Sequence, residues 1–457
     1  MKKLQRRAII CLFFAAILVV GTGIYIALLG INGDSWVSYP ANRHVFTKGK
    51  LTTGTILDSE GKVLLKNTKK GKQEYSSDPE TRKATLHAVG DVSGNIATGA
   101  NVAFRDKLVG YNFITGTYSA SGKGRRVDLT ISSRVSKVAN EALAGRSGTV
   151  GVYNYKTGEI LCMVSSPNYD PYTPPANNPD DKSGAFINRF TSAKVVPGSI
   201  FKLITATAAI EEIEDISSFR YRCTGSRQFD SSVKDRITCV YPHGDVDFKD
   251  ALAVSCNCAF GEIAIKVGGE KMKKYAQQAG LTNSYSIDGI NTMPGSFEFP
   301  ANQVNLAWAG IGQHKDLVNP CSMMVYMGAV ANGGKAANPR LIHGVKFNNG
   351  FPASLPFKTK TDELISEETA SKLSSMMRNN VIRTYGKENF KGLDICAKSG
   401  TAESGKTNAP NAWFTGFLRN EDHPYAFIVL VEKGGFGGQV AGSVANRVLQ
   451  EAVKQGN

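Results

Sequence analysis

The first 31 residues constrain the architecture more than any other part of the chain. MKKLQRR carries four basic residues, and the stretch from Ala8 to Ile31 that follows contains no charged side chain. As a helix, these 24 residues are long enough to cross about 30 Å of hydrocarbon. Residues 8–31 are predicted to be a transmembrane anchor, with residues 1–7 in the cytoplasm because basic flanks tend to stay there. A cleaved signal peptide is the alternative, but its apolar core is usually shorter.

Size and charge limit the remaining choices. A chain of 457 residues suffices for two or three domains. The formal charge is +15, but the lysines and arginines are spread along the chain, without zinc-finger spacing, a ribonucleoprotein signature or a basic zipper. We therefore expect no nucleic-acid partner. A basic surface close to an anionic membrane or wall polymer accounts for the charge.

The composition changes near residue 126. Residues 32–125 are polar and rich in lysine and glycine, and TTGTILDSEGKVLLKN predicts two short strands around a turn. This part is predicted to be a small extracytoplasmic pedestal. Residues 126–457 show strand patterns at both ends and helical patterns between them, which predicts one α+β domain whose sheet joins its two ends. Helices are expected at about 247–268, 301–333, 366–385 and 440–454.

The segment VVPGSIFKLITATAAIE places a serine and a lysine three residues apart before a run of good helix formers. Residues i and i+3 share a helix face, so Ser199 and Lys202 are neighbours if the helix begins at Ser199. A serine hydroxyl needs a base, and lysine is that base only if burial or a nearby cation lowers its pKa. The pattern predicts nucleophilic Ser199 with Lys202 as proton acceptor. A serine that merely caps the helix is the alternative.

Ser-x-x-Lys occurs by chance in many sequences. The order of two further motifs distinguishes the one at Ser199 from the other occurrences in this chain. The same spacing occurs at residues 59–62, in the predicted pedestal turn, and at residues 231–234, in a polar loop. Downstream of Ser199, only one Ser-x-Asn occurs, at residues 255–257, and only one Lys-[Ser/Thr]-Gly, at residues 398–400.

In this order, Ser-x-x-Lys, Ser-x-Asn and Lys-[Ser/Thr]-Gly resemble the penicillin-binding proteins and serine β-lactamases. The segments TGEILCMVSSPNYDP, ALAVSCNCAFGEIA, GIGQHKDLVNP and AKSGTAE resemble class B penicillin-binding proteins in particular. The resemblance covers about residues 126–457, and TTGTILDSEGKVLLKN is similar to the hairpin of the family's N-terminal module. It implies a transpeptidase domain with an antiparallel sheet packed with helices, carried by a β-rich pedestal and an N-terminal transmembrane helix.

The resemblance also implies catalytic roles for five residues. Ser199 would attack the carbonyl of the penultimate D-alanine, and Lys202 would take its proton. Ser255 would relay a proton to the leaving D-alanine. Asn257 would hold Lys202 and the substrate amide. Lys398 would keep Lys202 neutral by like-charge repulsion.

Three residues of the last motif are implied to bind substrate. Ser399 and Thr401 would bind the substrate carboxylate, and the backbone N–H groups of Ser199 and Thr401 would form the oxyanion hole. At Gly400 an edge strand that pairs with an extended peptide favours the absence of a side chain.

The activity implied is a peptidoglycan D,D-transpeptidase of the cell membrane. It would cross-link stem peptides that end in D-Ala-D-Ala, release D-alanine and be acylated by β-lactams. No cofactor is implied. The family usually works beside a glycan polymerase of the SEDS type, which we therefore expect as a partner.

The seven cysteines beyond Cys11 are interpreted mainly as small buried hydrophobes. Cys223 and Cys239 flank a polar loop and are compatible with a disulfide. Cys256 and Cys258 have the wrong spacing for a zinc knuckle and lack a histidine pair, so no metal is predicted. His243 lies in a loop that resembles the family's, and no chemistry is assigned to it.

Other activities remain open. A class A enzyme would need about 200 residues of glycosyltransferase, whereas the pedestal offers about 95. A β-lactamase would usually carry Glu-x-x-Leu-Asn, which does not occur between the second and third motifs. A membrane β-lactam sensor would need more than the seven residues expected inside the cell. A D,D-carboxypeptidase shares all three motifs, and a non-catalytic scaffold is disfavoured by the intact serine and lysines.

Overall fold

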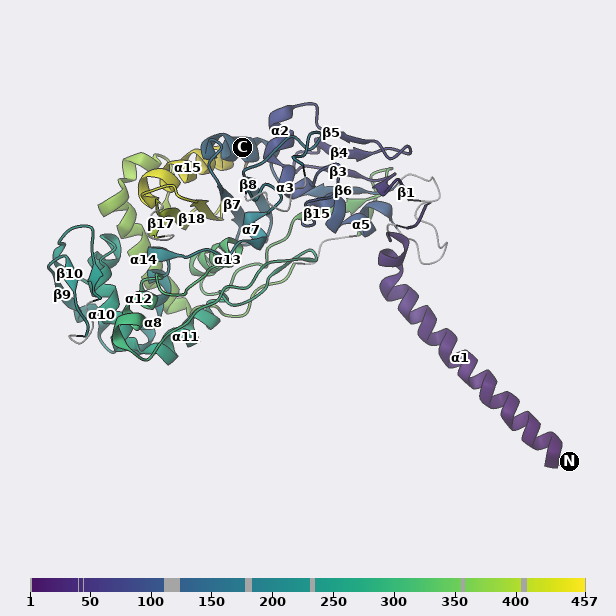
Figure 1. The fold of residues 1–457 in the computed structure, drawn as a ribbon, viewed down its shortest axis with the longest axis horizontal. Helices are drawn as coiled ribbons and strands as arrows, with labels where there is room; N and C mark the ends of the chain where they lie inside the picture. Colours follow the sequence, from purple (N-terminus) through teal and green to yellow (C-terminus); the bar gives the residue numbers. More distant parts are fainter. Residues whose placement is uncertain are drawn as a thin grey trace.

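An isolated helix and a compact body make up the molecule in the computed structural model (Figure 1). The structure describes residues 2–39, 41–43, 45–110, 124–176, 183–230, 235–354, 358–403 and 409–456. Helix α1 (Lys2–Val37) projects away from the body, and its apolar side chains are exposed. Within the described residues it is the one helix long and apolar enough to cross a membrane. The predicted anchor at residues 8–31 lies within it.

The pedestal is built on a six-stranded sheet. Its strand order is β16-β15-β6-β3-β4-β5. These strands are β3 (Thr55–Leu57), β4 (Val63–Asn67), β5 (Gln73–Tyr75), β6 (Arg126–Leu129), β15 (Ile342–Lys346) and β16 (Pro352–Ser354). The antiparallel pair β3–β4 is the hairpin expected from the sequence.

This sheet crosses the domain boundary drawn at residue 125. Strand β6 pairs in parallel with β3, and β15 pairs with the other side of β6. Half of the sheet therefore comes from residues assigned to the C-terminal domain. The composition change near residue 126 coincides with the start of β6. This strand belongs to the pedestal sheet, so the two parts of the chain share a sheet.

Small elements complete this end of the molecule. They are β1 (Phe46–Thr47), β2 (Lys50–Leu51), α2 (Pro79–Ala84), α3 (Leu86–Val89), α4 (Ala100–Ala103) and α5 (Arg105–Val109). The core at this end of the molecule includes Ile56, Leu65, Phe104 and Leu108, which are fully buried.

A second, five-stranded antiparallel sheet has the order β17-β18-β19-β7-β8. Its strands are β7 (Gly148–Asn154), β8 (Ile160–Ser166), β17 (Ile395–Ala402), β18 (Asn411–Leu418) and β19 (Tyr425–Val431). The sheet joins the two ends of the C-terminal part, as predicted. Strand β17, which carries the third motif, lies at the edge.

Apolar side chains cover both faces of this sheet because alternate residues of a strand point to opposite faces. One core contains Val429 with α6 (Ser133–Leu143) and α15 (Gly437–Ala452). The other contains Ile428 and Leu430 with α13 (Pro320–Ala331). A strand buried on both sides is a rigid support for catalytic groups at its edge.

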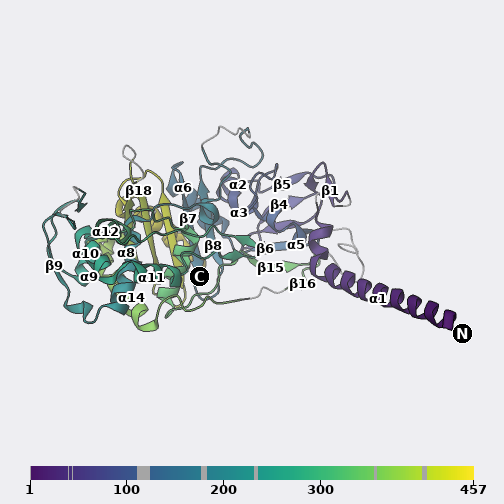
Figure 2. The same ribbon diagram turned by 60° about the horizontal axis from the view of Figure 1, so that its bottom comes forward.

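The remaining helices form a lobe on the side of the large sheet away from the pedestal (Figures 1 and 2). They are α8 (Lys202–Glu212), α9 (Phe248–Ala253), α10 (Asn257–Val267), α11 (Gly269–Gln278), α12 (Gln303–Gly310) and α14 (Glu367–Asn380). The short helix α7 (Arg189–Ser192) instead packs against β7 and β8. Short strands lie among the helices of the lobe: β9 (Arg220–Cys223), β10 (Ser226–Arg227), β11 (Ile237–Thr238) and β12 (Gly244–Asp247). The hairpin of β13 (Ser286–Ile287) and β14 (Ile290–Asn291) instead reaches the start of β15, where Asp288 Oδ2 accepts from Ile342 N–H at 2.8 Å.

Three predicted helices differ from the observed ones. The prediction at 247–268 is wrong in continuity, because Ser255 has φ +56° and separates α9 from α10. The prediction at 301–333 is split into α12 and α13. The one at 366–385 is α14 followed by a π turn at Val381–Tyr385. Hydrophobic periodicity does not reveal such breaks, because the helical segments on both sides of each break keep an apolar face.

Candidate active site

The turn that carries Ser199 is fixed by a glycine. Gly198 has φ +54°, and a Cβ there would lie 2.9 Å from both the Cβ of Ala402 and the carbonyl oxygen of Thr401. Its N–H donates to the carbonyl of Gly312 at 2.9 Å. A 3₁₀ turn at Gly198–Ile200 follows, and α8 begins at Lys202. The expected α-helix at Ser199 is thus a tighter turn, but it still places Ser199 beside Lys202.

Lys202 is the centre of the site. Its side chain is fully buried, and Nζ lies 3.1 Å from Ser199 Oγ and 3.1 Å from Ser255 Oγ. Nζ also donates to Asn257 Oδ1 at 2.7 Å and to the carbonyl of Ser255 at 2.7 Å. Burial lowers the pKa of Lys202 to about 8. A lysine with this pKa exchanges a proton readily near neutral pH.

Lys398 approaches the same serine from the edge strand. It is fully buried, and its Nζ donates to Ser255 Oγ at 3.0 Å and to the carbonyl of Ser399 at 2.8 Å. Burial, and secondarily the charge of Lys202, lower the pKa of Lys398 well below its ordinary value. Two buried amines on either side of one hydroxyl disfavour double protonation. Burial, one of the two causes that the sequence argument named, is the main cause of the low pKa of Lys202.

Ser255 owes its position to a strained backbone. Its positive φ lies in the left-handed region that side-chain-bearing residues rarely adopt. This conformation ends α9 and turns the hydroxyl between the two lysine ammonium groups. Strain of this kind is common at functional sites. Asn257, the first residue of α10, then directs Oδ1 to Lys202 and Nδ2 to the carbonyl of Thr238 at 2.7 Å.

Gly400 is required by packing inside the protein. A Cβ at this position would lie 2.9 Å from the carbonyl oxygen of Pro197 and 3.0 Å from the side chain of Ile200. The edge strand therefore presses against the turn that bears Ser199. The sequence argument assigned this glycine to contact with a bound peptide, whereas the structure supplies an internal reason.

Two residues of this site were assigned no site role from the sequence, although one of them, Gln313, lies in the GIGQHKDLVNP segment. Tyr385 Oη donates to Ser399 Oγ at 3.0 Å and accepts from Ser399 N–H at 2.8 Å. Gln313, interpreted as structural, donates from Nε2 to the carbonyl of Thr401 at 3.3 Å. Both lie far from the motifs along the chain, so no spacing rule finds them. Thr401 Oγ1 in turn accepts the first N–H of α15, at Gly437, at 3.2 Å.

Trp413 packs in the core beneath the site and supports the segment that leads to Ser199. Its side chain is fully buried, and Nε1 donates to the carbonyl of Val196 at 3.0 Å. Phe414, the next residue, packs on the opposite face of the sheet with α15. The NAWFTGF segment suggested core packing for both residues rather than contact with substrate, and both are fully buried.

The predicted residues surround one cleft of about 390 Å³. Its lining includes Ser199, Ser255, Asn257, Ser399 and Thr401. Trp308, Gln313, Tyr241, His243, Glu403 and Phe436 also line it. The competing motif at residues 59–62 lies in the pedestal hairpin turn, and the one at residues 231–234 lies outside the described residues.

Cys223 and Cys239 lie close together without a bond. Both are free thiols in this structure, with their sulfur atoms 3.8 Å apart. Cys239 Sγ is also 3.8 Å from Cys256 Sγ and 3.6 Å from Cys258 Sγ. Cys256 is completely buried, in agreement with its interpretation as a buried thiol, and its neighbour Cys239 lines the cleft.

Comparison of the sequence with known proteins identifies a family and several relatives. Residues 148–450 match the family described as "Penicillin binding protein transpeptidase domain". The peptidoglycan D,D-transpeptidase PbpA of Mycolicibacterium smegmatis is 27% identical over 373 residues, covering 76% of this chain and 75% of that protein. Stage V sporulation protein D of Bacillus subtilis is 27% identical over 365 residues, covering 74% of this chain and 55% of that protein.

Solved structures show the same fold. The crystal structure of PBPA from Mycobacterium tuberculosis superimposes with a TM-score of 0.77 at 23% identity, covering 88% of this chain and 99% of that one. The imipenem acyl-enzyme complex of the same protein gives a TM-score of 0.77 at 23% identity, covering 88% and 98%.

Proposed function

The chain belongs to the penicillin-binding protein transpeptidase family, and from this premise we propose that it is a peptidoglycan D,D-transpeptidase whose nucleophile is Ser199. One observation carries the proposal. A single buried amine, Lys202 Nζ, lies 3.1 Å from Ser199 Oγ and 3.1 Å from Ser255 Oγ. It can therefore take a proton from one hydroxyl and pass it to the other.

Acylation begins with the neutral amine of Lys202. It removes the proton of Ser199 as Oγ bonds to the carbonyl carbon of the penultimate D-alanine. The oxyanion that develops is stabilised by the backbone N–H groups of Ser199 and Thr401, the donors that the family resemblance implies. Gly198 and Gly400 hold these two backbones together, because neither leaves room for a side chain between them.

The same proton then reaches the leaving group. Lys202 returns it through Ser255 Oγ to the nitrogen of the terminal D-alanine, so that the amide C–N bond breaks and D-alanine departs. Lys398 Nζ, at 3.0 Å from Ser255 Oγ, orients this hydroxyl. Asn257 fixes Lys202 and the substrate amide, and Ser399 and Thr401 bind the terminal carboxylate.

Transpeptidation requires an amine as the second substrate. The amine of another stem peptide attacks the acyl carbon, its proton passes to Lys202, and Lys202 restores the proton to Ser199 Oγ. No metal or other cofactor takes part in these steps. A β-lactam acylates Ser199 through the same first step, since its ring amide occupies the place of the D-Ala-D-Ala amide.

The location follows from α1. We propose that α1 is a single-pass anchor with the basic N-terminus in the cytoplasm, so that the cleft faces the wall outside the membrane. A SEDS-type glycan polymerase in the same membrane is the proposed partner, because it would supply the glycan strands whose peptides this site joins.

Labelling with a fluorescent penicillin tests the nucleophile. We expect the full-length chain in detergent to gain one label per molecule, and Ser199→Ala to gain none. Ser59→Ala is the matched control, because it removes the serine of the other described Ser-x-x-Lys sequence and should label like the wild type. Label on Ser199→Ala, or an unlabelled wild type, would contradict the proposal.

A second assay separates transpeptidation from D,D-carboxypeptidation. The wild-type chain is given a D-Ala-D-Ala peptide with increasing amounts of an amine acceptor. A transpeptidase forms the cross-linked product at the expense of the hydrolysed one. Hydrolysis alone at every acceptor concentration would favour the carboxypeptidase.

A further inference from the structure

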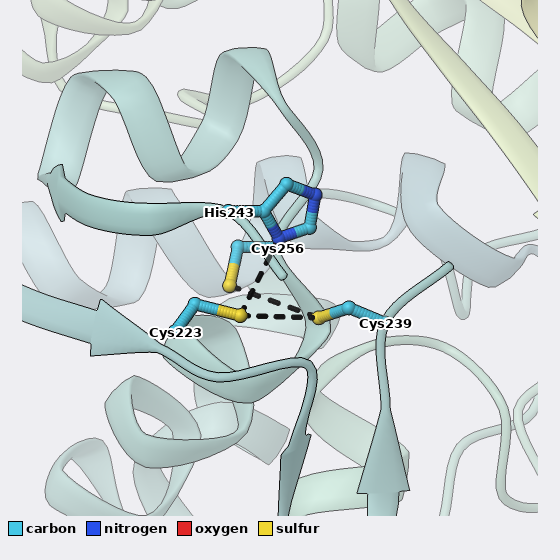
Figure 3. A group of neighbouring side chains, drawn as sticks. All are labelled: Cys223, Cys239, His243 and Cys256. Carbon is cyan, nitrogen blue, oxygen red and sulfur yellow. Dashed lines mark hydrogen bonds between the residues drawn. The ribbon is translucent and has the colours of Figure 1, made fainter. Parts of the chain in front are cut away.

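Three cysteine sulfurs and one imidazole nitrogen converge beside the Ser255–Asn257 turn. They belong to Cys223, Cys239, Cys256 and His243, and all four atoms lie within 4.8 Å of one another. Figure 3 shows the three sulfurs and the Nδ1 edge of His243 directed at a common point. Cys223 and Cys256 are buried, and the other two residues are partly exposed.

Three of the six separations among these atoms match those between zinc ligands, and the other three are no longer than 4.8 Å. Around a tetrahedral Zn²⁺, sulfurs at about 2.3 Å and a nitrogen at about 2.0–2.1 Å lie about 3.8 Å (S–S) and about 3.5 Å (S–N) from each other. The observed separations are 3.8 Å for Cys223–Cys239, 3.8 Å for Cys239–Cys256 and 3.5 Å for Cys223 Sγ–His243 Nδ1. We propose that Cys223, Cys239, His243 and Cys256 bind one Zn²⁺.

The fold brings the four ligands together from separate segments. Cys223 ends β9, and its partner in the β9–β12 ladder is Gly244, so His243 lies beside it. Cys239 directly follows β11, and its N–H donates to the carbonyl of Gly225 at 2.8 Å. Cys256 caps α10. Cys239 and His243 are four residues apart, but the other two ligands lie 16 residues before Cys239 and 13 residues after His243. The second close pair that usually marks a zinc site in a sequence is therefore missing, and the sequence predicted no metal.

A metal explains the cluster better than one disulfide does. Joining Cys223 to Cys239 would give no role to the Nδ1 edge of His243 and would leave Cys256 Sγ only as the cap of α10, where it accepts from Ala259 N–H at 3.4 Å. Zinc uses all four groups, and binding releases the thiol protons to solvent because thiolates are the ligands. Cys258 Sγ, although 3.6 Å from Cys239 Sγ, is not among the mutually close four and contacts the carbonyl of Ile237 at 3.7 Å.

The surrounding segment has little else to hold it. Residues 220–247, apart from the undescribed 231–234, form the two-stranded pairs β9–β12 and β10–β11. Most of their residues are exposed or half-buried, and Val240 is 82% exposed. Small segments that cannot bury enough apolar surface commonly depend on a metal or a disulfide.

Zinc would affect catalysis by holding the Ser255–Asn257 turn in place. Thr238 and Cys239 are neighbours, and the carbonyl of Thr238 accepts from Asn257 Nδ2 at 2.7 Å. Cys256 lies between Ser255 and Asn257 in the second motif. The metal would thus fix the loop and the catalytic turn to each other, and a shift of about 1 Å in such a turn can slow a reaction roughly 100-fold.

Metal analysis of the full-length chain, purified without chelator from cells grown with added zinc, is the first test. We expect one zinc per chain, and X-ray absorption should show about three sulfurs at about 2.3 Å and one nitrogen at about 2.0–2.1 Å. A wild-type chain without zinc, or mass-spectrometric detection of a Cys223–Cys239 disulfide, would overturn the proposal.

Two cysteine variants test the ligand assignment. Cys256→Ser should lose zinc, whereas Cys258→Ser, two residues away, should retain one per chain. Cys321→Ala, a buried thiol in α13, controls for the general loss of a core cysteine. Zinc retained by Cys256→Ser would overturn the assignment, and so would its loss from Cys258→Ser alone.

Penicillin labelling of the same samples tests the positioning role. Chelator-treated wild type should be labelled more slowly and should recover when zinc is restored. Equal labelling rates with and without zinc would overturn this role. Because zinc content is measured independently of labelling, the failure of this proposal and the failure of the transpeptidase proposal are distinguishable.

Discussion

Two walls of the catalytic cleft are held in different ways. The sheet wall consists of β17 with β18 and β19 behind it, and all but three residues of these strands are buried. The loop wall consists of residues 220–247, outside the undescribed 231–234, and in its four short strands only three residues are buried. The sheet wall carries Lys398, and the loop wall supports Asn257.

The difference shows that one cleft combines two sources of rigidity. Apolar packing on both faces fixes the sheet wall, so its positions depend on core volume. Polar contacts and the sulfur–imidazole cluster fix the loop wall, so its position depends on the ligands of that cluster. Ser199 and Lys202 lie between the two walls and need both.

Trp413→Ala should have the largest effect and should act on the sheet wall. It removes a fully buried indole and its 3.0 Å hydrogen bond to Val196, so we expect a loss of about 3–5 kcal/mol in the free energy of unfolding. Urea denaturation measures the loss. Trp308→Ala, at a half-buried tryptophan beside the loop wall, should cost clearly less. Equal losses would mean that the two walls are not supported differently.

The pH dependence of acylation tests the amine between the walls. Because burial lowers the pKa of Lys202 to about 8, the neutral base is the minor form below this pH and the major form above it. The acylation rate should therefore rise with pH and level off above about 8, and at pH 6 it should be about 100-fold below the plateau. Second-order rate constants for a penicillin between pH 6 and 9 provide the measurement.

The pH dependence of acylation needs a control for the loss of zinc at low pH. Acid also protonates thiolates and would release zinc from the loop wall. Zinc content and the unfolding midpoint should therefore be measured at pH 6 and pH 8. A rate that stays constant from pH 6 to 9, in a protein that remains folded, would exclude Lys202 as the titrating base.

Tyr385→Phe should have a smaller effect, confined to the substrate end of the sheet wall. The loss of Oη removes hydrogen bonds to Ser399 Oγ and N–H, each worth about 0.5–1.5 kcal/mol. The two bonds together amount to about 1–3 kcal/mol, so we expect the second-order acylation constant to fall roughly 5- to 150-fold. Tyr326→Phe removes a buried hydroxyl bonded to Thr207 in the core, and should leave that constant unchanged. The same fall in both variants would point to a general structural effect.

The sequence predicted the residues of the three motifs better than the residues that support them. Ser199, Lys202 and Lys398 are found by spacing and order, because the turn and the edge strand are continuous segments. Tyr385 lies outside the three motifs, and no motif spacing identifies it. Of the four zinc ligands, only Cys239 and His243 are close in the sequence, and Cys223 and Cys256 join them only in the folded chain. The break at Ser255 is not predicted either, because a left-handed residue leaves no mark on helical periodicity.

Val240→Ser should have the smallest effect, and it tests whether apolar packing contributes to the stability of the loop wall. Val240 is 82% exposed and next to Cys239, so Val240→Ser should change the free energy of unfolding by less than about 0.5 kcal/mol. Val429→Ser, the same change at a buried position of β19, should cost several times more, since it removes apolar contacts and buries a hydroxyl. Both losses are measured by urea denaturation of zinc-loaded protein. A large loss at Val240 would show that the loop is held by apolar contacts formed when it closes, and would weaken the case that the loop wall depends on a metal.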